Sequence, residues 1–87
     1  MAGYKDFLKY DARRHFVVLL AADDLGDRAT LHYIAQEIGC TRAEAQRALD
    51  SAISQFGVQI EKVGSVYRIL GWGVLKKSAL RDIVNSV

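Results

Sequence analysis

The sequence predicts a small α+β domain, mostly helical, in which a β-hairpin follows three helices and precedes a last one. Two observations lead to this fold class. Apolar residues recur at helical spacing in several segments, and the period shortens to two after Gly57, where a strand pattern begins. Glycines separate the segments, as they do at helix ends and turns, and the chain contains no proline.

Length and composition indicate one domain over residues 1–87. Hydrophobic residues make up 51% and charged residues 25%, which is typical of a globular chain and excludes a disordered tail. No apolar run approaches the roughly 18 residues of a membrane span, and the first residues lack the apolar core of a signal peptide. We therefore expect no membrane association. The lone Cys40 has no partner for an internal disulfide, which favours the cytoplasm.

The first long helix is expected from Asp11 to Asp24, with Asp11 as its N-cap. Its apolar stripe consists of Ala12, Phe16, Leu19 and Leu20. Three apolar residues further upstream continue this stripe, either in the same helix or in a separate one: Tyr4, Phe7 and Leu8.

Two capped helices come next and are joined by a short turn. Thr30 caps a helix from Leu31 to Ile38, which a glycine ends. A single residue separates that glycine from Thr41, which with Glu44 matches the capping-box pattern S/T-x-x-E. The second helix is therefore expected over residues 42–55. Its buried stripe is Ala45, Ala48, Leu49, Ala52, Ile53 and Phe56.

The alternating pattern over residues 58–70 predicts the hairpin. Gly64 and Ser65 suit a two-residue type II′ turn, which takes glycine first. This turn places Glu61 opposite Arg68, and a cross-strand pair of opposite charge supports this register over a one-residue slip. The side chains expected to face the core are Val58, Ile60, Tyr67 and Ile69.

A last helix is expected over residues 74–87, with large apolar residues along one side. Such side chains are costly to leave in water, so the stripe must fold back on its own chain or meet a second copy. We expect a homodimer, because a two-fold pair doubles the surface that a small domain offers to a palindromic partner. The expected dimer contacts are Leu80, Ile83, Val84 and Val87.

The order of these elements resembles a known family of domains. The stretch from Leu31 to Ile53 resembles a helix-turn-helix, and with the following hairpin residues 11–71 resemble a winged helix domain. The residues that carry the resemblance are Ile34 and Ala35 in the first helix, Gly39 and Cys40 at the turn, and Ala45 and Leu49 in the second helix. The resemblance implies that the second helix lies in the major groove of DNA while the hairpin, or wing, touches the backbone.

The candidate DNA contacts that follow from the resemblance are Thr41, Arg42, Gln46 and Arg47 on the helix, and Lys62, Ser65 and Arg68 on the wing. Arginine can read guanine, and glutamine adenine, through paired hydrogen bonds. The free N–H groups at a helix start attract phosphate. Lys62 is a stronger phosphate candidate than Arg68, which faces Glu61. The competing interpretation is a solvated helix face, because Glu44 and Asp50 cancel the charges of the two arginines.

Two further basic clusters fit either phosphate contacts or a solvated surface. They are Lys76, Lys77 and Arg81 in the last helix, and Arg13 and Arg14 near Lys9.

Nothing in the sequence predicts an enzyme, a cofactor or a metal. His15 and His32 lie on different helices without a nucleophile motif, and Cys40 suits the turn as a small apolar residue. Neither C-x-x-C nor H-x-x-x-H is present to hold a metal ion, and no glycine-rich phosphate loop occurs.

We therefore predict a sequence-specific protein that binds double-stranded DNA, in the role of a small transcriptional regulator. The net charge of +2 is modest for that task and leaves two alternatives open. One is a winged helix that docks a protein partner through the same face. The other is a DNA-architectural factor of a phage or plasmid replication or excision complex.

Overall fold

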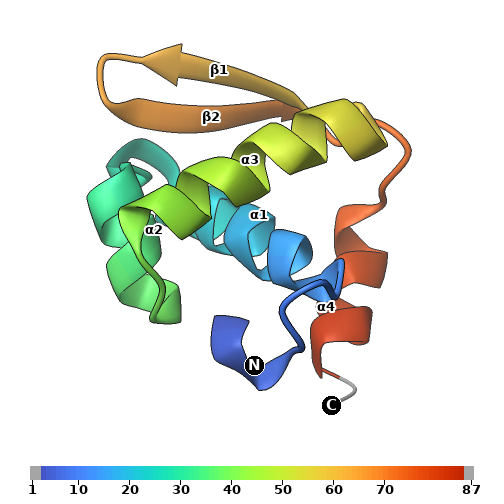
Figure 1. Ribbon diagram of the computed structural model, residues 1–87. Helices are drawn as coiled ribbons and strands as arrows, with labels where there is room; N and C mark the ends of the chain where they lie inside the picture. Colours follow the sequence, from blue (N-terminus) through green and yellow to red (C-terminus); the bar gives the residue numbers. More distant parts are fainter. Residues whose placement is uncertain (1–2, 86–87) are drawn as a thin grey trace.

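The computed structural model describes residues 3–85, which form four α-helices and one β-hairpin (Figure 1). In chain order the elements are the 3₁₀ turn η1 (Tyr4–Asp6), α1 (Arg13–Leu25), the 3₁₀ turn η2 (Gly26–Arg28), α2 (Leu31–Ile38), α3 (Arg42–Phe56), β1 (Gln59–Val63), β2 (Val66–Gly71) and α4 (Lys77–Asn85). The predicted small, mostly helical α+β fold is confirmed, and the layout is compatible with that of a winged helix.

Helix α1 is the centre of the core. Every residue from Phe16 to Ala22 is buried, and the helix contacts η1, α2, α3, α4 and β2. The sequence predicted a single apolar stripe on this helix, but other elements cover it on nearly all sides. A helix that is apolar around its circumference must be enclosed in this way.

The chain before α1 forms a separate segment rather than a helical extension. Tyr4 and Phe7 are buried against the core, whereas Leu8 is 83% exposed. Asp11 is not the N-cap, a position that Ala12 occupies. The Asp11 carboxylate instead accepts the backbone N–H of Arg13 at 2.9 Å and also the Arg13 guanidinium, which lowers the pKa of Asp11 to about 2.

The caps of α2 and α3 are confirmed. The Thr30 hydroxyl accepts the backbone N–H of Tyr33 at 3.2 Å. At the start of α3, the Thr41 hydroxyl accepts the N–H of Glu44, and the Glu44 carboxylate accepts the N–H of Thr41, both at 3.0 Å. Helix α3 ends one residue later than predicted. Ile53 is 45% exposed, so its placement in the buried stripe was wrong; it lies a quarter turn from the centre of that face.

The hairpin has the predicted register, with Ile60 opposite Ile69 and Glu61 opposite Arg68. Gly64 has a φ of +63° and Ser65 has no positive φ, as a type II′ turn requires. The ion pair expected across the strands is replaced, because Arg68 pairs with Asp27 of η2 at 2.9 Å. Of the side chains expected in the core, Val58 and Tyr67 are buried, while Ile60 and Ile69 are half-buried.

Helix α4 begins three residues later than predicted and covers α1 of its own chain. Leu80 and Val84 are buried, and two ion pairs join the helices, Lys77 to Asp23 and Arg81 to Asp24. Two of the expected dimer contacts, Leu80 and Val84, are thus covered within the chain, and the homodimer itself stays a prediction. Ile83 is 40% exposed, and Val87 lies outside the described residues.

Gly73 is required where the chain leaves the hairpin for α4. The N–H of Val74 donates to the carbonyl of Phe56 at 3.0 Å, so the two backbones touch. A Cβ on Gly73 would lie 2.0 Å from that same carbonyl oxygen, and the φ of Gly73 is +60°.

We predict that Gly73→Ala lowers the free energy of unfolding by about 3 kcal/mol, because it adds a backbone clash to an unfavourable φ. Gly39→Ala is the matched control, since Gly39 also has a positive φ but its Cβ would meet open space. That variant should lose only about 1 kcal/mol. Equal losses in urea titrations would contradict the close approach.

His15 of α1 is a half-buried residue with an unsatisfied polar atom. Its Nδ1 is buried without a hydrogen-bond partner among the described residues. Burial lowers the pKa of the imidazole below its ordinary value of 6.5. The unfolded chain therefore takes up a proton at a higher pH than the folded chain, and stability falls as the pH drops below about 6.5.

We predict that His15→Gln flattens this acid loss of stability, measured as urea midpoints between about pH 7.5 and about pH 5.5. The control His32→Gln makes the same substitution at an exposed histidine and shows what the loss of a histidine side chain does by itself. An unchanged pH dependence in His15→Gln would overturn the assignment.

Candidate nucleic-acid interface

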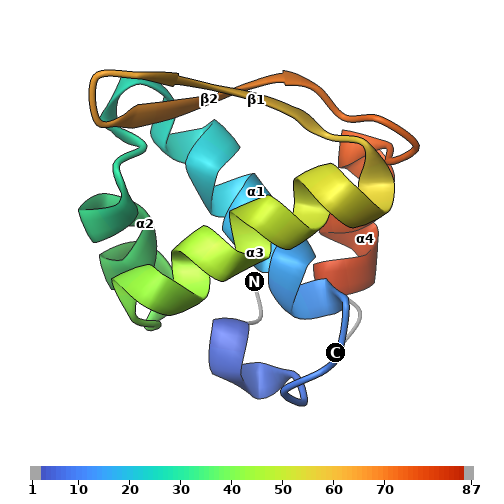
Figure 2. The same ribbon diagram turned by 45° about the horizontal axis from the view of Figure 1, so that its top comes forward.

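Helix α3 lies on the outside of the molecule, between two other surface elements. Its buried face packs on α1 through Ala45, Ala48, Leu49 and Ala52. Figure 2 shows α3 in front of α1, with the hairpin along one side and the N-terminal segment along the other. The opposite face of α3 therefore points to solvent, and it includes Ala43, Arg47, Asp50 and Ser54.

Gln46 joins α3 to the hairpin. Its Oε1 accepts the hydroxyl of Tyr67 at 2.8 Å, and its Nε2 donates to the Asp50 carboxylate at 3.0 Å. The sequence proposed Gln46 as a reader of adenine, but both of its polar atoms are engaged within the chain. One N–H and one lone pair of the Gln46 amide remain unused by these two hydrogen bonds, so reading of adenine by Gln46 stays a prediction. The role that the structure gives to Gln46 is to hold the hairpin against α3.

The hairpin has a second anchor in its backbone. The N–H of Tyr67 donates to the carbonyl of Ala29, just before α2, at 2.8 Å. Tyr67 thus fixes β2 through its backbone to the start of α2 and through its side chain to α3. The hairpin is held at a set angle to both helices.

The candidate cations on this face differ in how far they are engaged. Arg42 contacts the Nδ1 of His32 through its Nη2 at 3.0 Å. The Lys62 ammonium lies 5.5 Å from the centre of the Tyr67 ring. Arg47 is exposed and forms no hydrogen bond or ion pair with another residue of the described range 3–85. None of the three cations is neutralised by a carboxylate among these residues, so all can meet an anionic ligand.

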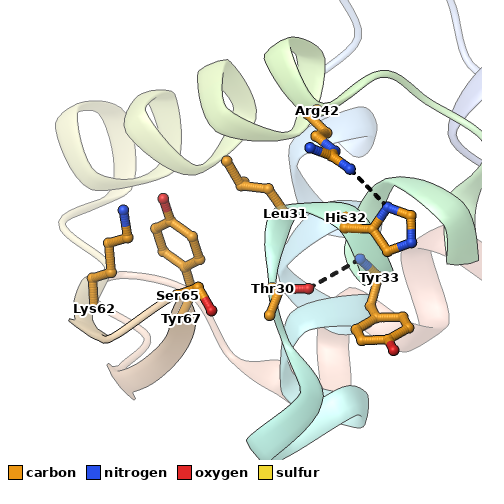
Figure 3. A pocket seen from close by; sticks show the side chains of 8 residues that line it. All are labelled: Thr30, Leu31, His32, Tyr33, Arg42, Lys62, Ser65 and Tyr67. Atoms are coloured by element: carbon orange, nitrogen blue, oxygen red, sulfur yellow. Dashed lines mark hydrogen bonds between the residues drawn. The ribbon is translucent and has the colours of Figure 1, made fainter.

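A pocket of about 420 Å³ lies between the start of α2, the start of α3 and the hairpin (Figure 3). Its lining consists of Thr30, Leu31, His32, Tyr33, Arg42, Lys62, Ser65 and Tyr67. Arg42 and Lys62 come from opposite walls, and Arg28 lies over the Tyr33 ring at 5.3 Å. The structure therefore brings the predicted residues Arg42, Lys62 and Ser65 together.

Other predicted candidates are used elsewhere. The Thr41 hydroxyl accepts a hydrogen bond in the cap of α3, and Arg68 forms an ion pair with Asp27. The basic residues of α4, Lys77 and Arg81, are paired with acids of α1. Arg13 and Arg14 hold the N-terminal segment, with their guanidinium groups 4.6 Å from the ring centres of Phe7 and Tyr4.

The sequence patterns did not predict the contribution of His32, Tyr33 and Tyr67 to this pocket. The one available signal was the predicted hairpin register, which places Tyr67 opposite Lys62. The predicted capping role of Glu44 is confirmed, whereas the hydrogen bond between Asp50 and Gln46 was not predicted. Glu44 completes the cap and Asp50 holds Gln46, so both carboxylates have local structural tasks.

Residues 3–85 were also searched for metal-binding clusters and membrane-spanning helices. Residues 3–85 contain no cluster of three potential metal-ligating side chains and no helix long and apolar enough to cross a membrane. Burial raises the pKa of the Cys40 thiol, which keeps it protonated. Comparison with family models, curated proteins and solved structures finds no match to this chain.

We predict that Tyr67→Phe lowers the free energy of unfolding by about 1 kcal/mol, because it removes a half-buried hydrogen bond to Gln46. Tyr33→Phe serves as the control, since no hydrogen bond links the Tyr33 hydroxyl to another described residue. That variant should be neutral in the same urea titration. A neutral Tyr67→Phe would mean that the hairpin is held by its backbone alone.

Proposed function

We propose that the chain binds double-stranded DNA as a winged helix, with α3 in the major groove and the hairpin, its wing, on the backbone. The role we propose for it is that of a small transcriptional regulator. The observation that carries the proposal is the set of cations Arg42 and Arg47 on α3 and Lys62 on the hairpin, none of which is paired with a carboxylate of residues 3–85. Phosphate contacts by such cations dominate the affinity of DNA-binding proteins.

The dimensions of α3 support this arrangement. An α-helix with its side chains is about 10–12 Å wide, close to the roughly 12 Å width of the major groove. The 15 residues of α3 give a rod of about 22 Å, long enough to cross the groove. The outward side chain of Arg47 would then face the base edges or the nearer phosphates.

The pocket beside α3 suits a segment of the DNA backbone. Lys62 and Arg42 on its two walls provide donors for phosphate oxygens, and the exposed Tyr33 offers apolar surface to a sugar. Asp50, which lies on the outward face, would be repelled by phosphate, but a carboxylate can accept from the amino group of cytosine. We therefore assign the middle of α3 to the bases and its start to the backbone.

The proposal does not depend on a dimer. The sequence argued for a two-fold pair built on the last helix, but that helix covers α1 of its own chain. The phosphate contacts of a single domain alone correspond to a Kd of about 10⁻⁴ to 10⁻⁶ M at physiological salt, and contacts of α3 with the bases would add the sequence preference.

We predict distinct effects of two variants on duplex binding, measured by fluorescence anisotropy. Arg47→Ala should reduce discrimination between sequences by about 1–3 kcal/mol if the contact is to guanine. Lys62→Ala should weaken all duplexes alike and lower the slope of log Kd against log salt by about one. Lys76→Ala, which removes an exposed lysine remote from α3 in sequence, is the control and should bind as the wild type does.

Two results would contradict the proposal. One is no binding of the wild type to any duplex at about 50 mM salt. The other is an equal loss in all three variants, because this would indicate a general effect of charge. Absence of duplex binding would favour the alternative in which the same face docks a protein.

A further inference from the structure

We propose that the turn from Leu8 to Asp11 is a second DNA-contacting element, which meets the backbone strand opposite the one that the wing meets. This inference rests on the proposed function. In this arrangement Lys9 contacts a phosphate, and the ring of Tyr10 lies against the neighbouring sugar. The wing and the turn together would hold α3 between the two walls of the groove.

The turn lies on the side of α3 that the wing leaves open. A cavity of about 270 Å³ separates Lys9 and Tyr10 from Arg47 and Ser51 of α3. The wing reaches α3 at Gln46, five positions before Ser51, and five residues correspond to about 140° around a helix. Figure 2 shows the same relation, with the hairpin and the N-terminal segment on opposite sides of α3.

The turn is held firmly at both of its ends. Before it, Phe7 is buried, and its carbonyl accepts the Nε of Arg14 at 2.9 Å. After it, Asp11 is clamped by Arg13. Within the turn, the N–H of Asp11 donates to the carbonyl of Leu8 at 2.9 Å. Lys9 and Tyr10 are therefore the tip of a fixed turn, so little conformational entropy is lost when they bind.

The tip has the chemistry of a backbone contact. Tyr10 is 92% exposed, and the Lys9 ammonium lies 5.7 Å from the centre of its ring. An exposed tyrosine next to a lysine offers a flat apolar surface, a hydroxyl and a positive charge at one place. Arg47 on the far side of the cavity adds a second cation. Glu44, the carboxylate in the cavity lining, is already engaged with the N–H of Thr41.

The shape of DNA explains why two flanks are needed. The major groove is bounded by two phosphate strands, so a helix that lies in it has a strand at each side. Lys62 on the wing faces one of them. On the other side of α3, the described elements include this turn, and Lys9 stands at its tip. A positive tip at this place favours phosphate over an apolar protein partner.

The experiment compares variants of the turn with variants of the wing in anisotropy titrations on one duplex. Lys9→Ala should weaken binding about threefold at about 200 mM salt and lower the salt slope by about one. The double variant Lys9→Ala/Tyr10→Ala should lose about tenfold, while Tyr10→Phe should keep nearly full affinity because it keeps the ring. Circular dichroism checks the fold, which these exposed residues should not affect.

A cross-link identifies the contact directly. A benzophenone side chain in place of Tyr10 should attach to the duplex on irradiation. If Lys62→Ala weakens binding but the double variant does not, the inference is wrong and the proposed function stands. If the wild type binds no duplex, both fail. A cross-link between two copies of the chain, with none to DNA, would overturn the inference in favour of a protein contact.

Discussion

The enclosure of α1 is the constraint on which the rest of the structure depends. Because the side chains from Phe16 to Ala22 are buried all around the helix, other elements must cover it on every side. The N-terminal segment, α2, α3, β2 and α4 do so. Several polar interactions hold these covering elements against α1, such as the pairing of Lys77 with Asp23 and the contact of Arg14 with Tyr4.

This use of charge explains why so few cations are free for a ligand. The basic residues next to α1 hold the neighbouring elements against it. Arg47 of α3 and Lys62 of the hairpin instead face outward. Tyr67 fixes the position of the hairpin beside α3, because it forms hydrogen bonds to both Ala29 and Gln46. The outward cations of α3 and the hairpin are thereby held in a defined arrangement. Stability and the proposed binding face thus depend on the same side chain.

The local elements could be predicted from the sequence because their signals are local. The capping box at Thr41 and the Gly64 turn specify backbone hydrogen bonds within a few residues. The partners of charged and apolar side chains depend on tertiary contacts, and the spacing of residues in the sequence does not show these contacts. Arg68 forms an ion pair with Asp27, which is distant in the sequence, instead of with Glu61. The apolar stripe of the last helix was interpreted as a dimer surface because the sequence predicted an apolar stripe on only one side of α1. A contact between α1 and the last helix was therefore not expected.

The central claim is that α3, with the hairpin and the N-terminal turn at its sides, forms one continuous surface for duplex DNA. Backbone amide chemical shifts of the labelled protein, followed by NMR during titration with a duplex, test it most directly. We expect changes along residues 42–54 and at both turn tips, with α4 unaffected. Changes confined to α4, or none at any accessible DNA concentration, would contradict it.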